Sequence, residues 1–498
     1  MNSKQKGIWN LFSSAASQVI VIAFGLVLPR LFIVSYGSEV NGLLSSLNQL
    51  LVYLNLFEAG VGAATLQALY RPVAEGDWDA TSRVLAATDR YYRRTGRWYL
   101  AALLALTVLY PLAVSSELSY GVVAGAVFFS GIGNVVLFYF QGKYSFLLQA
   151  EGKNYIYTNL TTLISILTSL SKVALIALGA NIVVILAAAF CVQLIQMVYI
   201  LWYIRRNYPQ LRLDSPPDVE AIAQRNYALV HQISALIFNN TDVLILTIVC
   251  GLRVVSVYSM FKLVTSHLEN ILNIFPNSVR FVLGQTYQTD LTLYARRSDL
   301  LEVCYAAMVY AVFSVTLFLF LPFMSLYTAG VTDVNYVDGR LAVLFVAASL
   351  LNLSRTCPLM TINFAGHFQQ TMGRSILESA INLTVSLLCV FRFGIYGVLW
   401  GTIAALAYRT NDIILYANHV LLHRSALRSY AVYGVDLVLL LGLQPLFRCL
   451  FPAAITSYLQ LIAIGFGTTA LALAVFGLSL LLHPAVRQTL REHFQYKK

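Results

Sequence analysis

Long apolar segments recur along the chain at short intervals, and most are longer than a helix of a soluble protein. A helix needs about 20 mostly apolar residues to cross the hydrocarbon core of a bilayer. The pattern therefore predicts an all-α polytopic membrane protein with about fourteen spans. Their expected ranges are 8–34, 43–70, 98–114, 121–148, 156–178, 182–204, 227–250, 254–283, 303–326, 341–363, 375–391, 395–420, 430–448 and 455–482.

Polar side chains inside several of these ranges recur at steps of three or four residues, which places them on one face of a helix. Such a face should line a hydrated path and not contact lipid. Pro276 and Pro358 each remove a helical hydrogen bond and free a carbonyl one turn earlier. The polar faces comprise Lys262, Ser266, Glu269, Asn273, Asn277 and Arg280; Asn159, Thr162, Ser165, Ser169 and Lys172; and His231 or Gln232, Asn239 and Asp242.

Composition agrees with this pattern, because 58% of the residues are hydrophobic and only 11% are charged, against roughly 25% charged in soluble proteins. An ordinary soluble enzyme is excluded. The net charge of +11 comes from 33 Lys and Arg and 22 Asp and Glu. With both termini cytoplasmic, the outer loops hold only Arg253, Arg340, Arg392 and Arg448, and most of the remaining basic residues lie in inner loops. This asymmetry predicts that both termini are cytoplasmic, and it explains the net charge without nucleic acid. The expected location is the cell inner membrane.

A Pro216-Pro217 linker divides the spans into two sets of six that correspond at a shift of about 214 residues, so that Gly37 pairs with Gly251 and Ser45 with Ser259. Parallel repeats of this kind are a transporter arrangement. We therefore expect two pseudo-symmetric six-helix lobes and two additional helices. The expected domains are 1–205, the cytoplasmic linker 206–226, 227–422, and 423–498 with the tail.

Three stretches resemble one family of membrane proteins: Asn239 to Leu246 with Gly251 and 254–259, Tyr36 to Gly42, and Phe393 to Thr402. They are similar to polysaccharide and oligosaccharide-lipid flippases of the multidrug/oligosaccharidyl-lipid/polysaccharide flippase superfamily. The resemblance covers nearly the whole chain. It implies two six-helix lobes, a central cavity that opens alternately to each side, and a lipid-diphosphate-linked oligosaccharide as cargo.

Ionisable residues at mid-membrane depth are costly and usually functional. The cations are candidates for phosphate binding and the acids for coupling ions, and a small cationic excess favours an anionic cargo. The structural alternatives are that Arg409 and Asp412 neutralise each other, that Asp242 and Glu269 neutralise Lys262, and that Lys143, Arg280 and Glu378 reach the inner interface. The candidate cations are Arg30, Lys172, Lys262, Arg355 and Arg409, and the candidate acids are Glu58, Asp242, Glu269 and Asp412.

The expected function is therefore flipping of a lipid-linked oligosaccharide across the membrane by alternating access. The expected partners are that cargo, membrane lipids, and a proton or sodium ion if transport is coupled; we expect no cofactor, metal or nucleic acid. One alternative is a cation-coupled drug or toxin antiporter of the same superfamily. The other is a membrane-embedded glycan polymerase or glycosyltransferase, which the absence of a sizeable predicted external loop disfavours.

Overall fold

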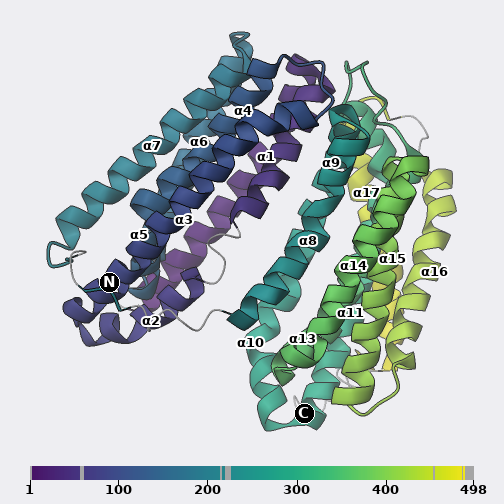
Figure 1. The fold of residues 1–498 in the computed structure, drawn as a ribbon. Helices are drawn as coiled ribbons and strands as arrows, with labels where there is room; N and C mark the ends of the chain where they lie inside the picture. Colours follow the sequence, from purple (N-terminus) through teal and green to yellow (C-terminus); the bar gives the residue numbers. More distant parts are fainter. Residues whose placement is uncertain are drawn as a thin grey trace. The chain divides into compact units, whose positions relative to one another are not determined.

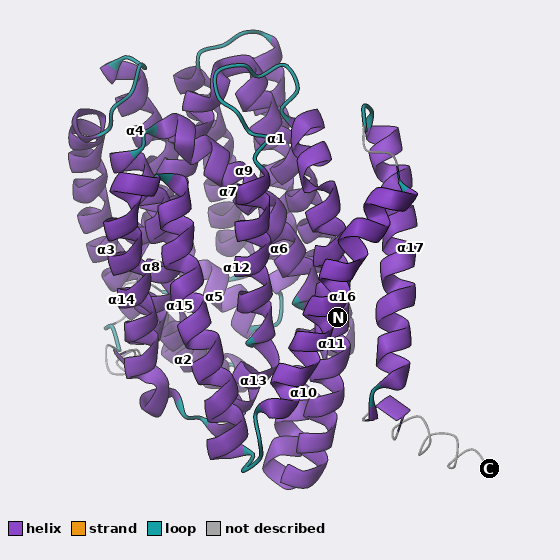
Figure 2. Cartoon of the chain, turned by 90° about the vertical axis from the view of Figure 1, so that its right-hand side faces the viewer, coloured by secondary structure: helices purple, strands orange, loops and turns teal. Residues whose placement is uncertain are grey.

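The computed structural model describes residues 3–55, 61–212, 216–218, 226–451, 455–484 and 486–487. Within these residues every regular element is a helix (Figure 2). The chain divides into two compact units, Met1–Ser256 and Val257–Lys498. The division expected at 206–226 remains a prediction.

The first unit consists of helices α1 to α8 (Figure 1). Helix α1 packs against α6 and α8, and α4 packs against α3 and α7. Asp77 caps the start of α3 through a side-chain hydrogen bond to the Ala80 amide, and Asn181 caps α7 in the same way through Val183. The elements are α1 (Ser3–Leu54), α2 (Val61–Glu75), α3 (Trp78–Ala113), α4 (Tyr120–Val136), the π-helical turn η2 (Leu137–Gln141), α5 (Gly142–Ala150), α6 (Asn154–Ala177), α7 (Ile182–Asn207) and α8 (Asn226–Val249).

The second unit is built around α11, which packs against α10, α12, α16 and α17. Helix α9 begins in the first unit at Leu252 and continues into the second. The elements are α9 (Leu252–Leu272), α10 (Ile274–Thr289), α11 (Leu291–Tyr327), α12 (Gly339–Ser354), α13 (Thr356–Ala365), α14 (Phe368–Phe393), α15 (Ile395–Leu415), the π-helical turn η4 (Tyr416–Leu421), α16 (Leu427–Leu450) and α17 (Tyr458–Leu482).

The all-α membrane fold predicted from the apolar pattern is confirmed. In the part of the chain that the structure describes, each of the fourteen expected ranges falls on helix. Ten helices there are long and apolar enough to cross a membrane on length and composition alone. The helix breaks at Asn273, three residues before Pro276, and at Arg355, three residues before Pro358, in keeping with the helical hydrogen bond that each proline removes.

Gly37 and Gly251, the residues paired by the predicted repeat, adopt the same unusual backbone conformation. Each has a φ of 82°, a region that favours glycine because it carries no Cβ. Gly37 is the single non-helical residue inside the 52-residue α1, and Gly251 separates α8 from α9. Each of the two expected outer turns of the repeat therefore contains a glycine with the same φ.

Each unit has its own apolar core. In the first, Leu43, Leu47, Tyr99 and Leu103 are completely buried in one cluster. In the second, the buried ring of Phe261 lies 4.9 Å from that of Phe320 and 5.6 Å from that of Phe345, measured between centroids. Aromatic pairs at such distances stabilise a core beyond their buried area.

Candidate functional site

The break between α12 and α13 places Arg355 among polar groups inside the second unit. Its Nη2 donates to Asn352 Oδ1 at 2.8 Å, and its Nη1 lies 2.5 Å from Glu378 Oε1 on α14. Because Pro358 has no N–H, the Ser354 carbonyl has lost its helical donor. The hydroxyl of Tyr433 on α16 lies 2.8 Å from that carbonyl and replaces the lost bond.

Glu378 joins Arg355 to a second arginine. Arg409 Nε on α15 lies 3.5 Å from Glu378 Oε2, and Arg409 Nη1 lies 2.5 Å from Asp412 Oδ2. Asp412 in turn pairs with Arg374 of α14. The five residues form a continuous run of alternating charges across α12, α14 and α15, and we call them the arginine network. Only 4% of Arg409 is exposed, so its charge depends on these two carboxylates.

Glu269 of α9 extends the polar contacts beyond the arginine network. Its Oε2 accepts a hydrogen bond from Asn352 Nδ2 at 3.0 Å, and it interacts electrostatically with Lys262 and Arg355. Lys262 Nζ also lies 5.7 Å from the centroid of the Tyr258 ring, a cation–π distance. Asn352 thus links Glu269 to Arg355.

The predicted site residues of the second unit are therefore brought together. Arg355, Arg409 and Asp412 belong to the arginine network, and Glu269 connects it to Lys262. The predicted pairing of Arg409 with Asp412 is confirmed.

Two expectations for residues near the inner ends of helices were wrong. Glu378 is buried between Arg355 and Arg409 and does not extend to an interface. Lys143 is only 4% exposed and pairs with Asp89, whose other oxygen lies 2.8 Å from Arg93 Nε. Sequence position alone could not show that a residue of opposite charge on another helix pairs with each of them.

The predicted site residues of the first unit lie on three different helices. Arg30 of α1 and Lys172 of α6 are half-buried, and Asp242 of α8 is only 2% exposed. Among the described residues of this unit Lys172 has no hydrogen bond and no ion pair, whereas Arg30 and Asp242 each have a polar or electrostatic partner. Glu58 lies outside the described residues.

Neutral hydrogen bonds join α1 to α8, and Tyr110 of α3 takes part in them. Ser46 accepts from the Tyr110 hydroxyl at 2.7 Å and lies 2.8 Å from Thr247 Oγ1. One turn or more away, the hydroxyls of Tyr53 and Thr241 are 2.7 Å apart. These five residues, Ser46, Tyr53, Tyr110, Thr241 and Thr247, form what we call the α1–α8 seam.

The α1–α8 seam continues to the start of α9. There Asn41 Nδ2 donates to Ser256 Oγ at 2.7 Å. Gly42 lies so close that a Cβ added to it would be 1.8 Å from the Leu252 carbonyl oxygen. A glycine is required at this position because no side chain fits between the two backbones.

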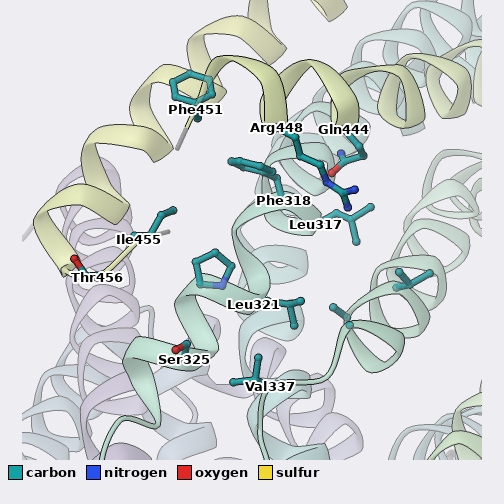
Figure 3. Close-up of a pocket in the computed structure, with 14 residues that line it drawn as sticks. Leu317, Phe318, Leu321, Ser325, Val337, Gln444, Arg448, Phe451, Ile455 and Thr456 are labelled. Carbon is teal, nitrogen blue, oxygen red and sulfur yellow. The ribbon is translucent and has the colours of Figure 1, made fainter. Parts of the chain in front are cut away.

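A separate, mostly apolar cavity of about 630 Å³ lies between α11, α12 and α16 (Figure 3). Leu317, Phe318 and Leu321 of α11 form one wall. Gln444 and Arg448 project from α16 beside Leu317 and Phe318, as Figure 3 shows. Gln444 Nε2 donates to the Ser314 carbonyl at 3.1 Å. None of the predicted site residues lines this cavity.

No protein-family model and no curated protein matches the sequence. Solved structures do match its fold. The structure titled lipid II flippase MurJ, inward closed conformation, has a TM-score of 0.66 at 12% identity, covering 95% of this chain and 99% of that one. The chain has the fold of that flippase.

The same fold occurs in multidrug transporters. An inward-facing MATE family transporter of the MOP superfamily matches with a TM-score of 0.56 at 13% identity, covering 86% of this chain and 96% of that one. The MATE multidrug transporter DinF-BH matches with a TM-score of 0.56 at 15% identity, covering 83% of this chain and 96% of that one. At these identities the likeness extends to the fold and leaves the cargo open.

Proposed function

We propose that the chain is a transporter that flips a lipid-diphosphate-linked oligosaccharide across the cell inner membrane by alternating access. The fold it shares with a lipid II flippase supports transport. The observation that carries the choice of cargo is Lys172, a cation on a membrane helix with no counter-charge among the described residues of its unit. An ion at that depth costs at least about 2.5–3.5 kcal/mol unless a partner or water stabilises it. A phosphate would be such a partner.

Arg355 is a further candidate phosphate-binding residue in this proposal. A guanidinium can donate two parallel hydrogen bonds to phosphate, and the ammonium groups of Lys172 and Lys262 add point charges. Because Arg355 already pairs with Glu378, a cargo phosphate would compete with that carboxylate. Arg30 and Arg409 remain candidate cations, and Glu58, Asp242, Glu269 and Asp412 remain candidate coupling acids for a proton or sodium ion. No covalent step is needed, so no enzyme activity is proposed.

The proposed organisation keeps the lobes 1–205 and 227–422, the cytoplasmic linker 206–226 and the additional region 423–498, with both termini cytoplasmic. Reporter fusions after Arg94 and after Arg206 should give cytoplasmic signals, and a fusion after Thr332 should give an external one. An external signal after Arg94 would contradict the orientation.

The cargo is tested by genetic complementation combined with analysis of lipid-linked glycans. Loss of the protein should cause a cytoplasm-facing lipid-linked oligosaccharide to accumulate. Lys172→Ala and Arg355→Ala should give the same accumulation at normal protein amount, and Arg355→Lys should restore transport only if charge suffices. Arg90→Ala is the matched control, because Arg90 is an exposed cation on α3. Full transport by both alanine variants would exclude this cargo.

A drug or toxin antiporter is the second candidate, and the matches to MATE transporters favour it. Such a protein should export cationic dyes in exchange for a cation, and its export should depend on membrane acids such as Asp242 or Glu269. Dye export together with normal lipid-linked glycans in cells that lack the protein would select this candidate.

A further inference from the structure

Glu302 of α11 is a buried acid that the sequence patterns did not single out. Only 6% of it is exposed. Its Oε1 lies 2.6 Å from the hydroxyl of Tyr433 on α16, and that hydroxyl also lies 2.8 Å from the Ser354 carbonyl oxygen at the break before Arg355. One hydroxyl thus connects a carboxyl group to a backbone carbonyl.

The number of protons in this chain of three oxygens decides the state of Glu302. A tyrosine hydroxyl carries one hydrogen, a backbone carbonyl only accepts, and an ionised carboxylate only accepts. If Tyr433 donates to Ser354, its contact with an ionised Glu302 has no hydrogen. If it donates to Glu302, the Ser354 carbonyl faces lone pairs at 2.8 Å and has no donor. Both contacts are satisfied together when the Glu302 carboxyl is protonated and donates to Tyr433.

No cation stabilises an ionised Glu302 by forming an ion pair with it in the described part of the chain. Arg424, which interacts electrostatically with Glu302, forms an ion pair with Asp299 and donates to Asn418 Oδ1 at 2.7 Å. Within the described residues no basic side chain forms an ion pair with Glu302. The other titratable or polar groups that face this cluster are Asp299 and Tyr310 of α11, Cys357 of α13, and Ser429, Tyr433 and Asp436 of α16.

We propose that Glu302 is a proton-binding site that controls the helix break at Arg355. With the proton bound, Tyr433 holds the Ser354 carbonyl and the break is fixed. When the proton leaves, the Tyr433 hydrogen turns to the carboxylate and the carbonyl loses its donor. The backbone next to Arg355 then relaxes, and the contact of Arg355 with Glu378 changes. The link to cargo rests on the proposed function, whereas proton binding does not.

Infrared spectroscopy of the purified full-length protein tests proton binding directly. A protonated carboxyl has a carbonyl stretch that is resolved from carboxylate bands and shifts in heavy water. This band should be present at neutral pH and should be lost in Glu302→Gln, whose amide can still donate to Tyr433. It should persist, at a shifted frequency, in Tyr433→Phe, which removes its hydrogen-bond partner. Asp436→Asn is the matched control, because Asp436 is another buried acid of the same unit and lies on α16.

A band that Asp436→Asn removes and Glu302→Gln leaves intact would overturn the proposal. The same conclusion would follow if the parent protein showed no such band.

Transport in proteoliposomes tests the coupling. A pH gradient should accelerate flipping of the lipid-linked oligosaccharide by the parent and by Asp436→Asn, and should not accelerate flipping by Glu302→Gln. A gradient response of Glu302→Gln equal to that of the parent would overturn the control of Arg355 by Glu302. If no protein flips the cargo while the infrared band behaves as expected, the cargo assignment fails and the proton site stands.

Discussion

The α1–α8 seam and the arginine network both join helices inside the membrane fold, but they use opposite chemistry. The seam consists of neutral hydroxyl groups 2.7–2.8 Å apart, so its bonds do not depend on any counter-ion. The arginine network consists of charged groups arranged around the buried Glu378 and Arg409, and a buried charge stabilises the fold only while its partner is present. An arginine of the network can exchange a carboxylate partner for another anion. The hydroxyl groups of the seam have no charged partner to exchange. This difference favours the seam as a fixed contact between helices, and the network as the part that the anionic cargo of the proposed function would affect.

The largest effect is expected when the arginine network loses Glu378. Glu378→Ala leaves Arg355 and Arg409 without a shared carboxylate and should lower the free energy of unfolding by about 3–5 kcal/mol, as removal of one partner of a buried pair does. Thermal unfolding in detergent and the protein amount in membranes measure this loss. Glu117→Gln is the control, since Glu117 pairs with Arg253 on an exposed surface. If the two variants were equally stable, the arginine network would contribute no more to the free energy of unfolding than an exposed surface pair.

The close backbone approach beside the seam gives the next effect. Gly42→Ala places a Cβ against the Leu252 carbonyl and should lower the free energy of unfolding by about 3 kcal/mol, the upper part of the range for overpacking. Gly121→Ala is the matched control, because a Cβ there meets no atom within 4 Å. A parent-like melting temperature for Gly42→Ala would show that α1 and α9 separate at low cost.

Ser46→Ala removes the shared hydroxyl of the seam. The buried Tyr110 hydroxyl then lacks its acceptor, and we expect a loss of about 2 kcal/mol, within the range for an unsatisfied buried polar group. Adding Tyr110→Phe should recover part of that loss, because both partners are then apolar. A double variant less stable than Ser46→Ala would contradict this account. Thermal unfolding measures the stability that Tyr110→Phe restores to Ser46→Ala. Such a recovery is expected when both members of a pair of neutral groups are removed.

The smallest effect concerns an exposed charge. Asp290 caps α11, and its hydrogen bonds with Thr292, then with Leu293, lower the pKa of its carboxyl below the ordinary value. The capping contribution is therefore complete above the unfolded-state pKa of about 3.9 and is lost as the pH falls through the lower folded-state value. The melting-temperature difference between the parent and Asp290→Asn should shrink below about pH 4. A difference that is constant with pH would contradict the assignment.

Periodicity along one helix predicted much of the fold and only part of the site. Pro358 predicted a carbonyl freed one turn earlier, where Ser354 now contacts Tyr433, and the three-residue spacing of Arg409 and Asp412 predicted their pair. Glu378 was missed as a partner, because its contacts with Arg355 and Arg409 depend on the packing of three helices that a single-helix pattern does not contain. Glu302 was missed for the same reason, since its partner Tyr433 is 131 residues away.

The α1–α8 seam also has a consequence for biosynthesis. Ser46 and Thr247 are 201 residues apart in sequence, so α1 must enter the membrane long before its partner helix leaves the ribosome. During that interval the hydroxyls of Ser46 and Tyr53 lack their partners on α8, and Ser46 has only Tyr110 of α3. The first unit becomes complete only after the linker and α8 have been translated. A ribosome stall within residues 206–226 would therefore leave a nascent chain with all earlier helices made and its seam still open.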